Sequence, residues 1–128
     1  MNTRKVSVLI VDDSEYFVDR MVSLLGEVEN ISTIQTAGNY FDAFRMLDNK
    51  KADVILLDIS LPGKSGLDLL QKIKQLEWQC AVIMISNLSA HYYEQECKKL
   101  RAWCLLDKTS EFDRVPELIN GYGELMSA

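Results

Sequence analysis

The strongest constraint on the fold is an alternation, repeated five times, of a short strand-like run with a longer stretch of helical character. The strand-like runs span residues 5–11, 31–37, 53–58, 80–86 and 102–106; the run at 31–37 alternates apolar and polar residues and is expected to be a more exposed strand. Apolar strands joined by short connections through helices are typical of a parallel sheet with helices on both faces. We therefore expect a doubly wound α/β domain with a five-stranded, mainly parallel sheet.

The first two helices are marked by a capping residue and a periodic apolar stripe. Ser14 is placed to cap a helix with apolar positions at Phe17, Met21, Leu24, Leu25 and Val28. Asn39 is placed to cap a shorter helix with apolar positions at Phe41, Phe44 and Leu47. Both assignments follow from the spacing of three or four residues that gives a helix one apolar face.

The remaining three helices are predicted from length, polarity and turn residues. Pro62, Gly63 and Gly66 mark a loop, and a helix is expected over 67–77 with Leu70, Ile73 and Leu76 inward. A polar helix is expected over 89–101. The last helix is expected to occupy most of 111–126. Because Pro116 suits a first helical turn, the regular helix is expected to begin there, with 111–115 as a separate turn.

Composition and charge exclude several classes of function. The 128 residues carry a net charge of −5 without a block of Lys or Arg, so the basic surface that nucleic acid or an anionic membrane requires is missing. No apolar run is long enough for a bilayer span or a signal peptide. The three cysteines, odd in number and without CxxC spacing, favour reduced thiols in a cytoplasmic protein. We expect neither a nucleic-acid nor a membrane partner.

Polar residues with complementary chemistry end four of the predicted strands. Asp12 and Asp13 end the first strand, Asp58 the third, Ser86 the fourth, and Lys108 follows the fifth. A single aspartate at a strand end is commonly a turn former or a helix cap. Four such strand ends together are different, because ligands of open α/β sheets bind beyond the carboxyl ends of the strands. We expect three carboxylates, a hydroxyl and an ammonium to meet at one edge.

This combination predicts a magnesium and phosphoryl site. Three neighbouring carboxylates either take up protons or share a cation, and oxygen ligands suit Mg²⁺. An ammonium and a hydroxyl beside them could bind the oxygens of a phosphoryl group. A nucleotide site is not supported, because the sequence has neither a GxGxxG motif nor a P-loop.

At these positions the chain resembles the receiver domain of bacterial two-component response regulators, of chemotaxis-regulator type. The matching motifs are "IVDDS" at 10–14, "DISLPGKSG" at 58–66, "MIS" ending at Ser86, and "DKT" with Lys108. The resemblance covers essentially the whole chain and implies one receiver domain over 1–128. It implies a flavodoxin-like fold whose parallel sheet has the strand order 2-1-3-4-5.

The resemblance also implies a role for each site residue. Asp58 is expected to accept a phosphoryl group from the phosphohistidine of a sensor histidine kinase or phosphotransfer protein. Asp13, Asp58 and the backbone carbonyl of Ser60 are expected to ligate Mg²⁺, with Asp12 acting mostly through a metal-bound water. Lys108 is expected to pair with the phosphoryl oxygens.

The signal is expected to leave through protein contacts. Ser86 should hydrogen-bond a phosphoryl oxygen and move its loop with the following helix. The fourth helix, fifth strand and fifth helix form the family's usual output face for a downstream protein target or a homodimer, and residues 91–93, His-Tyr-Tyr, open that helix. Simple packing of the two tyrosines against the sheet is the alternative. A metal role for His91 is not supported by its spacing.

Three departures from the family pattern carry predictions. Leu105 stands where the family often has an aromatic switch residue, and Trp103 is expected to serve in packing or as a surface contact. Thr109 replaces the proline that usually follows the lysine, so a trans Lys108–Thr109 bond is predicted. Leu88 should hinder an attacking water, which predicts slow self-dephosphorylation.

Two other functions stay open at this point. One is a binding module that keeps the site but acts without phosphorylation, which the unusual fifth-strand region allows. The other is a phosphatase with an aspartyl-phosphate intermediate. Such phosphatases carry a DxD motif after the first strand, in which the second aspartate is the general acid and base. In this chain Asp12 and Asp13 are adjacent, and Ser60 stands two residues after Asp58, where that second aspartate would be needed. Beyond slow self-dephosphorylation, no enzymatic turnover is expected.

Overall fold

The computed structural model describes residues 5–88 and 90–127 and contains one five-stranded parallel sheet with the order β2-β1-β3-β4-β5. The strands are β1 (Val6–Val11), β2 (Ile31–Ala37), β3 (Val54–Asp58), β4 (Ala81–Ser86) and β5 (Cys104–Asp107). The helices are α1 (Glu15–Leu25), α2 (Tyr40–Asn49), α3 (Gly66–Gln75), α4 (Ala90–Lys99), a 3₁₀ turn η1 (Phe112–Arg114) and α5 (Val115–Ser127). The expected doubly wound α/β fold and its strand order are confirmed.

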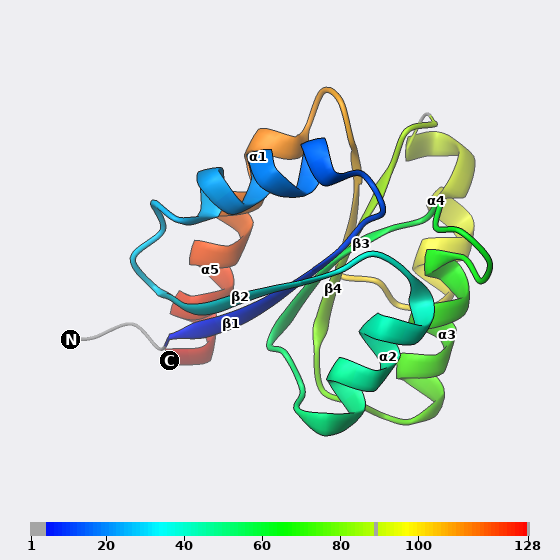
Figure 1. Cartoon of the computed structure of the whole chain (residues 1–128), viewed down its shortest axis with the longest axis horizontal. Coiled ribbons are helices and arrows are strands. Elements are labelled where there is room, and N and C mark those ends of the chain that lie inside the picture. The colour runs from blue at the N-terminus through cyan, green and yellow to red at the C-terminus, as the bar shows by residue number, and fades with distance from the viewer. Residues whose placement is uncertain (1–4, 89, 128) are drawn as a thin grey trace.

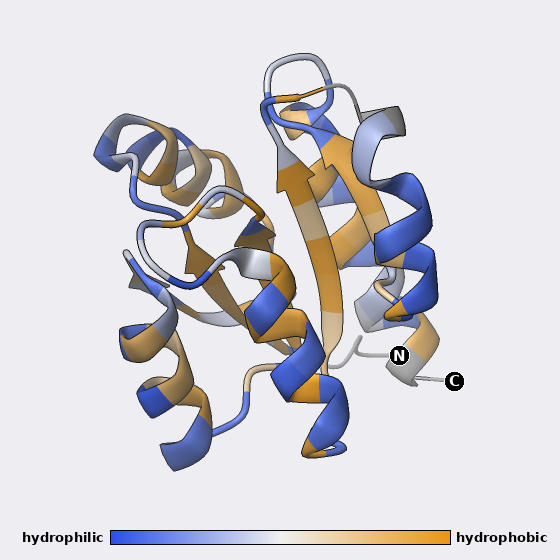
Figure 2. Ribbon diagram, turned by 90° about the vertical axis from the view of Figure 1, so that its right-hand side faces the viewer, coloured by the Kyte–Doolittle hydropathy of each residue, from blue (hydrophilic) through white to orange (hydrophobic). Residues whose placement is uncertain are grey.

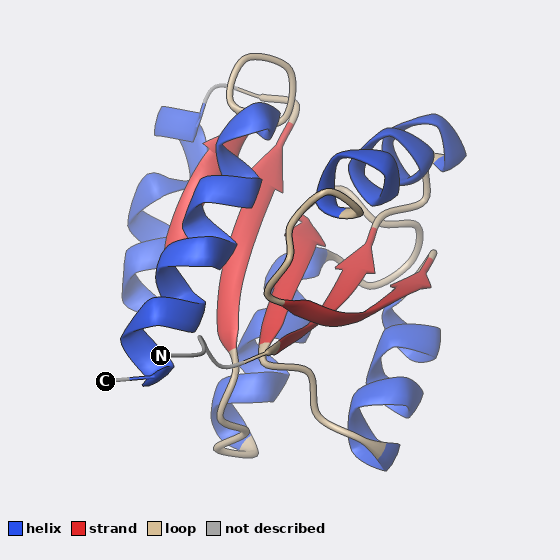
Figure 3. Ribbon diagram, turned by 90° about the vertical axis from the view of Figure 1, so that its left-hand side faces the viewer, coloured by secondary structure: helices blue, strands red, loops and turns tan. Residues whose placement is uncertain are grey.

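The helices form two layers, one on each face of the sheet (Figure 1). Helices α1 and α5 cover one face, and α2, α3 and α4 cover the other, an arrangement that Figure 3 shows from the left-hand side of Figure 1. Alternate residues of β1 serve the two layers: Val8 and Ile10 pack with α1 and α5, while Leu9 and Val11 pack with the other three helices. The three central strands β1, β3 and β4 are accordingly apolar along nearly their whole length, and strands appear orange in Figure 2, whereas the edge strand β2 is largely polar.

Short side chains fix the starts of three helices, as the sequence predicted for two of them. The Ser14 hydroxyl accepts the N–H of Phe17 at 3.3 Å, and the Asn39 side chain accepts the N–H of Asp42 at 2.9 Å. Ser65 caps α3 in a capping box with Asp68, which the sequence analysis did not anticipate. A cap that satisfies an otherwise unpaired N–H stabilises a helix by about 1 kcal/mol.

Two predicted details of the helices need adjustment, and a third concerns a residue outside the described part of the chain. Leu76 was expected to point inward but is 41% exposed, because it is the residue at which α3 ends. On α2, Leu47 is buried, whereas Phe41 is 65% exposed and the neighbouring Tyr40 is buried in its place. Residue Ser89, where the fourth helix was expected to begin, lies outside the described part of the chain.

The fifth strand begins two residues later than predicted. Arg101 has a left-handed φ of 58°, and the N–H of Ala102 bonds back to the carbonyl of Cys97 at 2.9 Å, so these residues terminate α4. Before α5, the turn η1 confirms that a separate turn precedes a regular helix. Within the described residues, no helix combines the length and the apolar character needed to cross a membrane.

Candidate functional site

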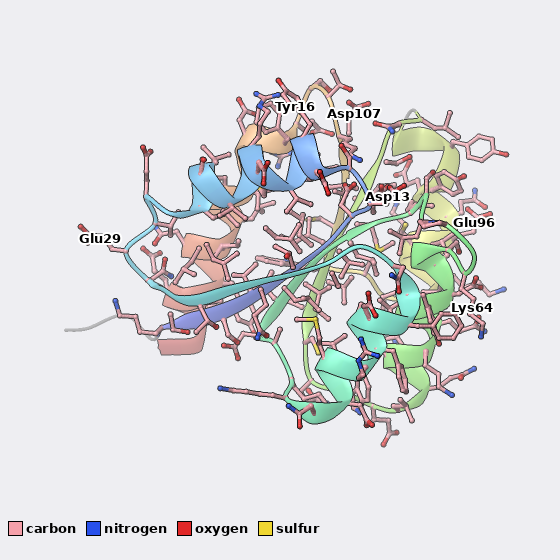
Figure 4. The ribbon with its side chains drawn as sticks, viewed as in Figure 1. Asp13, Tyr16, Glu29, Lys64, Glu96 and Asp107 are labelled. Atoms are coloured by element: carbon pink, nitrogen blue, oxygen red, sulfur yellow. The ribbon has the colours of Figure 1, made fainter. Side chains whose placement is uncertain are left out.

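The register of the parallel strands brings the predicted residues to one edge of the sheet. Val11 pairs with Leu57, so Asp12 follows directly beside Asp58. Asp58 in turn pairs with Ile85, and Ser86 pairs with Asp107, which precedes Lys108. The carboxyl ends of β1, β3, β4 and β5 therefore meet, and Figure 4 shows Asp13 and Asp107 at this same end of the molecule.

Asp58 is a buried carboxylate at the end of β3, with 1% of its surface exposed. Its Oδ1 accepts the N–H of Ser60 at 3.0 Å, and its Oδ2 lies 3.2 Å from Nζ of Lys108. Burial first, and the charge of Asp12 second, raise the pKa of Asp58 from 3.8 to about 6, although Lys108 and the Ser60 N–H act in the opposite direction. The ionised form of this carboxylate is therefore destabilised at neutral pH, and an additional positive charge nearby would stabilise it.

The two adjacent aspartates have different environments. Asp12 is buried, and its Oδ1 accepts the N–H of Ser14 at 2.8 Å. Its Oδ2 lies 2.7 Å from Nζ of Lys108 in an ion pair, yet accepts no well-aligned hydrogen bond from the described residues. Asp13 is exposed, and a cavity of about 440 Å³ opens beside the two aspartates. Solvent and small ions therefore have access to the pair.

Lys108 is held between the carboxylates and an aromatic ring. Its ammonium bridges Asp12 and Asp58, and it lies 4.7 Å from the centroid of the Phe17 ring. Burial alone would lower the pKa of Lys108, but its close contact with Asp12 and the charges of Asp58 and Asp12 raise it on balance. The side chain is therefore a fixed positive charge at the site.

The loop after Asp58 folds tightly over the end of β3. Gly66, the first residue of α3, donates its N–H to the carbonyl of Ile59 at 2.9 Å. A Cβ at Gly66 would lie 2.1 Å from the backbone oxygen of Asp58, so only glycine fits this approach. Gly63 supplies the turn with a φ of 75°. Glycine 66 thus fixes how the loop returns to the acidic residues.

Ser86 and Ser60 lie at the site but are engaged differently. Ser86 is buried, and its hydroxyl oxygen accepts the N–H of Leu88 at 3.1 Å. Its carbonyl accepts the N–H of Lys108 at 2.8 Å, which links β4 to the lysine. Ser60 contacts Asp58 through its N–H, and its carbonyl as a metal ligand stays a prediction.

Sequence reasoning missed three contributors to this geometry. Phe17 was expected only as a core residue, and its ring lies beside the Lys108 ammonium. Ser14 was expected only as a cap, and its backbone N–H also orients Asp12. Gly66 was read as a loop marker. Its place at the start of a predicted helix, eight residues after Asp58, was the available signal for a close backbone approach.

The carboxylates form a group that could hold a metal ion. One oxygen each from Asp12, Asp13 and Asp58 lies within 4.8 Å of the others. Three carboxylates face one ammonium, and an oxygen of Asp12 has no well-aligned donor among the described residues. A hard divalent cation with oxygen ligands such as Mg²⁺ fits this donor set, since it would neutralise the excess charge and keep waters at its open positions.

The region around β5 lacks the aromatic residue that receiver domains often have at the place of Leu105. Trp103 lies with its ring 5.7 Å from that of Tyr122 on α5, and 39% of it is exposed. This agrees with packing at the surface. The Lys108–Thr109 peptide bond is trans, as predicted from the missing proline.

Comparisons with known proteins give a consistent result. The response regulator receiver domain family matches residues 8–120. The sporulation initiation phosphotransferase F of Bacillus subtilis is 28% identical over 120 residues, covering 94% of this chain and 95% of that protein. A protein-glutamate methylesterase/protein-glutamine glutaminase of Clostridium acetobutylicum is 34% identical over 106 residues, covering 81% of this chain. The chain spans only 31% of that methylesterase.

Solved structures agree in fold. The signal receiver domain of a repressor protein from Vibrio parahaemolyticus superposes with a TM-score of 0.87 at 23% sequence identity, covering 96% of this chain and 93% of that one. At this identity the similarity shows the fold alone. The assignment to a family rests on the sequence match over 8–120.

Proposed function

This chain belongs to the response regulator receiver domain family, and from that premise we propose that it is a phosphorylation-dependent signalling switch whose acceptor is Asp58. The observation that carries the proposal is the ion-paired group at the sheet edge. Lys108 bridges Asp12 and Asp58 at 2.7 and 3.2 Å, within a set of three carboxylates suited to Mg²⁺. We also propose that residues 1–128 form one receiver domain.

The proposed reaction is a phosphoryl transfer to a carboxylate. An oxygen of Asp58 forms a bond to the phosphorus of a phosphohistidine, and the phosphorus–nitrogen bond breaks. The electron pair stays on the imidazole nitrogen, which takes up a proton, and Asp58 becomes an acyl phosphate. Bound Mg²⁺, held by Asp13, Asp58 and the carbonyl of Ser60, would supply positive charge to the phosphoryl oxygens.

The protein's own residues position the group and register its arrival. Lys108 is placed to exchange its contact with Asp58 for a phosphoryl oxygen, since its ammonium already lies 3.2 Å from Oδ2. Asp12 keeps the ammonium in place through the 2.7 Å ion pair. Ser86 would give up the N–H of Leu88 and donate its hydroxyl to another phosphoryl oxygen, which moves the loop before α4.

The proposed output surface comprises α4, β5 and α5. Exposed aromatic or apolar side chains occur on each of its parts: Tyr92 on α4 is 69% exposed, Trp103 just before β5 is 39% exposed, and Leu125 on α5 is 65% exposed. The side chain of His91 lies outside the described part of the structure. The upstream partner would be a histidine kinase or a phosphotransfer protein, and the downstream partner a protein or a second copy.

The alternative is a binding module that works without phosphorylation, and the region around β5 supports it. Trp103 packs on Tyr122, and Leu105 has no aromatic ring that could rotate. A phosphatase is disfavoured because no general acid stands two residues after Asp58, where the chain has Ser60. The esterase activity of longer relatives is not proposed for this chain.

The test is the mass of the intact protein after incubation with phosphoramidate and Mg²⁺. The switch predicts a gain of one phosphate that depends on Mg²⁺ and is absent in Asp58→Asn. The matched control is Asp48→Asn, an exposed aspartate on α2 that should still gain the phosphate. Binding of a partner with equal affinity to both forms would instead support the module that ignores phosphorylation.

A further inference from the structure

Asp107 and Glu111, two carboxylates outside the acidic site, accept hydrogen bonds from the backbone of the loop that carries Lys108. Asp107 is the last residue of β5, and its Oδ1 accepts the N–H of Thr109 and the N–H of Ser110, both at 2.9 Å. Glu111 reaches back, and its Oε1 accepts the N–H of Asp107 at 3.0 Å. The N–H of Glu111 bonds to the carbonyl of Asp107 at 3.0 Å, which closes the turn.

These bonds satisfy backbone groups that the sheet cannot reach. Strand β5 lies at the edge of the sheet. Lys108 donates its N–H to Ser86 on the β4 side, so the N–H of the preceding Asp107 points away from the sheet, where Glu111 meets it. Arg114 fixes Glu111 in turn through an ion pair of 2.8 Å. The hydrogen bonds also lower the pKa of Asp107, through Ser110 and Thr109, and that of Glu111, through Asp107.

The loop needs such a restraint because it lacks proline after the lysine. Thr109 leaves φ free at a place where proline would fix it, and each unrestrained residue costs about 1–2 kcal/mol of entropy when it is ordered. Among residues 107–111 only Lys108 sends its side chain to the acidic group, where it bridges Asp12 and Asp58. The direction of that side chain depends on the backbone that the two carboxylates hold.

We propose that Asp107 and Glu111 are positioning residues that act through Lys108: together they hold its backbone so that the ammonium is in place before a phosphoryl group arrives. This inference rests on the proposed function. A group displaced by about 1 Å can slow a reaction by up to about 100-fold, so loss of either carboxylate should slow phosphorylation by between about 10- and 100-fold. The affinity for Mg²⁺ should change little, because its proposed ligands lie at or just after the ends of β1 and β3.

The experiment is a double-mutant cycle on the rate of Asp58 phosphorylation by phosphoramidate with saturating Mg²⁺. Asp107→Ala should slow the reaction in the wild-type background and have no further effect in Lys108→Ala. Asp107→Asn should retain most of the wild-type rate, because the amide oxygen of asparagine can accept the same two N–H groups. Glu111→Ala is the second variant, and Asp113→Ala, an exposed carboxylate on η1, is the control that leaves the rate unchanged.

Each outcome decides the matter. An equal loss in both backgrounds would assign Asp107 a general structural role and overturn the proposal, as would a wild-type rate in Asp107→Ala and Glu111→Ala. If the wild-type protein accepts no phosphate at all, the proposed function fails. If the wild type is phosphorylated and the variants are not slower, only the positioning role fails.

Discussion

Replacing Asp58 by Asn should stabilise the metal-free protein at neutral pH. The side chain is buried beside Asp12, and burial followed by that charge raises the pKa of Asp58 from 3.8 to about 6. Since a tenfold change in proton affinity corresponds to about 1.4 kcal/mol, the ionised carboxylate opposes folding by about 3 kcal/mol. Solvent at the open edge of the sheet screens part of this effect and reduces it to about 2 kcal/mol.

The asparagine does not recover all of this free energy. Asp58 accepts the Ser60 N–H with one oxygen and contacts Lys108 with the other. An amide has only one oxygen, so one of these contacts is lost at a cost of about 1 kcal/mol. The expected net effect in Asp58→Asn is an increase of about 1 kcal/mol in the free energy of unfolding at neutral pH.

The pH dependence has a definite sign. The carboxyl of Asp58 loses its proton near 3.8 in the unfolded chain and at about 6 in the folded one. Between these values the folded state binds more protons, so the stability of the wild type falls as the pH rises. The advantage of Asp58→Asn should therefore be absent below about pH 4, grow up to about pH 6 and stay constant above it.

Urea unfolding in EDTA, followed by circular dichroism at a series of pH values, measures this difference. Asp48→Asn, which removes an exposed carboxylate on α2, is the matched control for the loss of one negative charge. Adding Mg²⁺ should favour the wild type, by about 2.7 kcal/mol at one hundred times its Kd, and favour Asp58→Asn less. The reasoning is refuted if Asp58→Asn is the less stable protein at neutral pH in EDTA, or if the pH has no effect on the difference.

Three further predictions concern the surroundings of Asp58. Gly66→Ala should lower the free energy of unfolding by at least about 2 kcal/mol and slow phosphorylation, because the added Cβ meets the Asp58 backbone. Gly121→Ala, in open space on α5, should instead raise the free energy of unfolding by about 0.5–1 kcal/mol. Unfolding curves of both variants test this. Lys108→Met should reduce the rate of phosphorylation by about 100-fold or more without abolishing Mg²⁺ binding, measured by calorimetry and mass spectrometry. The acyl phosphate should decay slowly, and Leu88→Gln should shorten its lifetime by admitting a water; decay within seconds in the wild type would contradict this.

The sequence predicted that Asp12, Asp58 and Lys108 would meet at one edge of the sheet, because strand ends are local features. An apolar run that stops at an aspartate identifies the residue at the end of a strand, and in a parallel sheet all such ends meet at one edge. Asp12, Asp58 and Lys108 are brought together in this way. The buried strand β1 likewise follows from a continuous apolar run, and the apolar face of α1 from a spacing of three to four residues.

What the sequence did not predict depends on contacts between distant elements. The bond from Ala102 to Cys97 ends α4 and delays β5, and nothing in the run "AWCLL" signals it. The approach of Phe17 to Lys108 joins α1 to the loop after β5, across most of the chain. Leu76 fits the apolar stripe of α3 but lies at its end, where one residue more or less decides whether a side chain is covered.

The central claim is that a single carboxylate, that of Asp58, receives the phosphoryl group. The most direct measurement is to incubate the protein with phosphoramidate and Mg²⁺, reduce it with borohydride, and identify the modified residue by peptide mass spectrometry. Borohydride converts an aspartyl phosphate to homoserine and leaves free aspartate unchanged. The account predicts homoserine at position 58 and unmodified residues at 12 and 13; homoserine at either of those positions, or none anywhere, would contradict it.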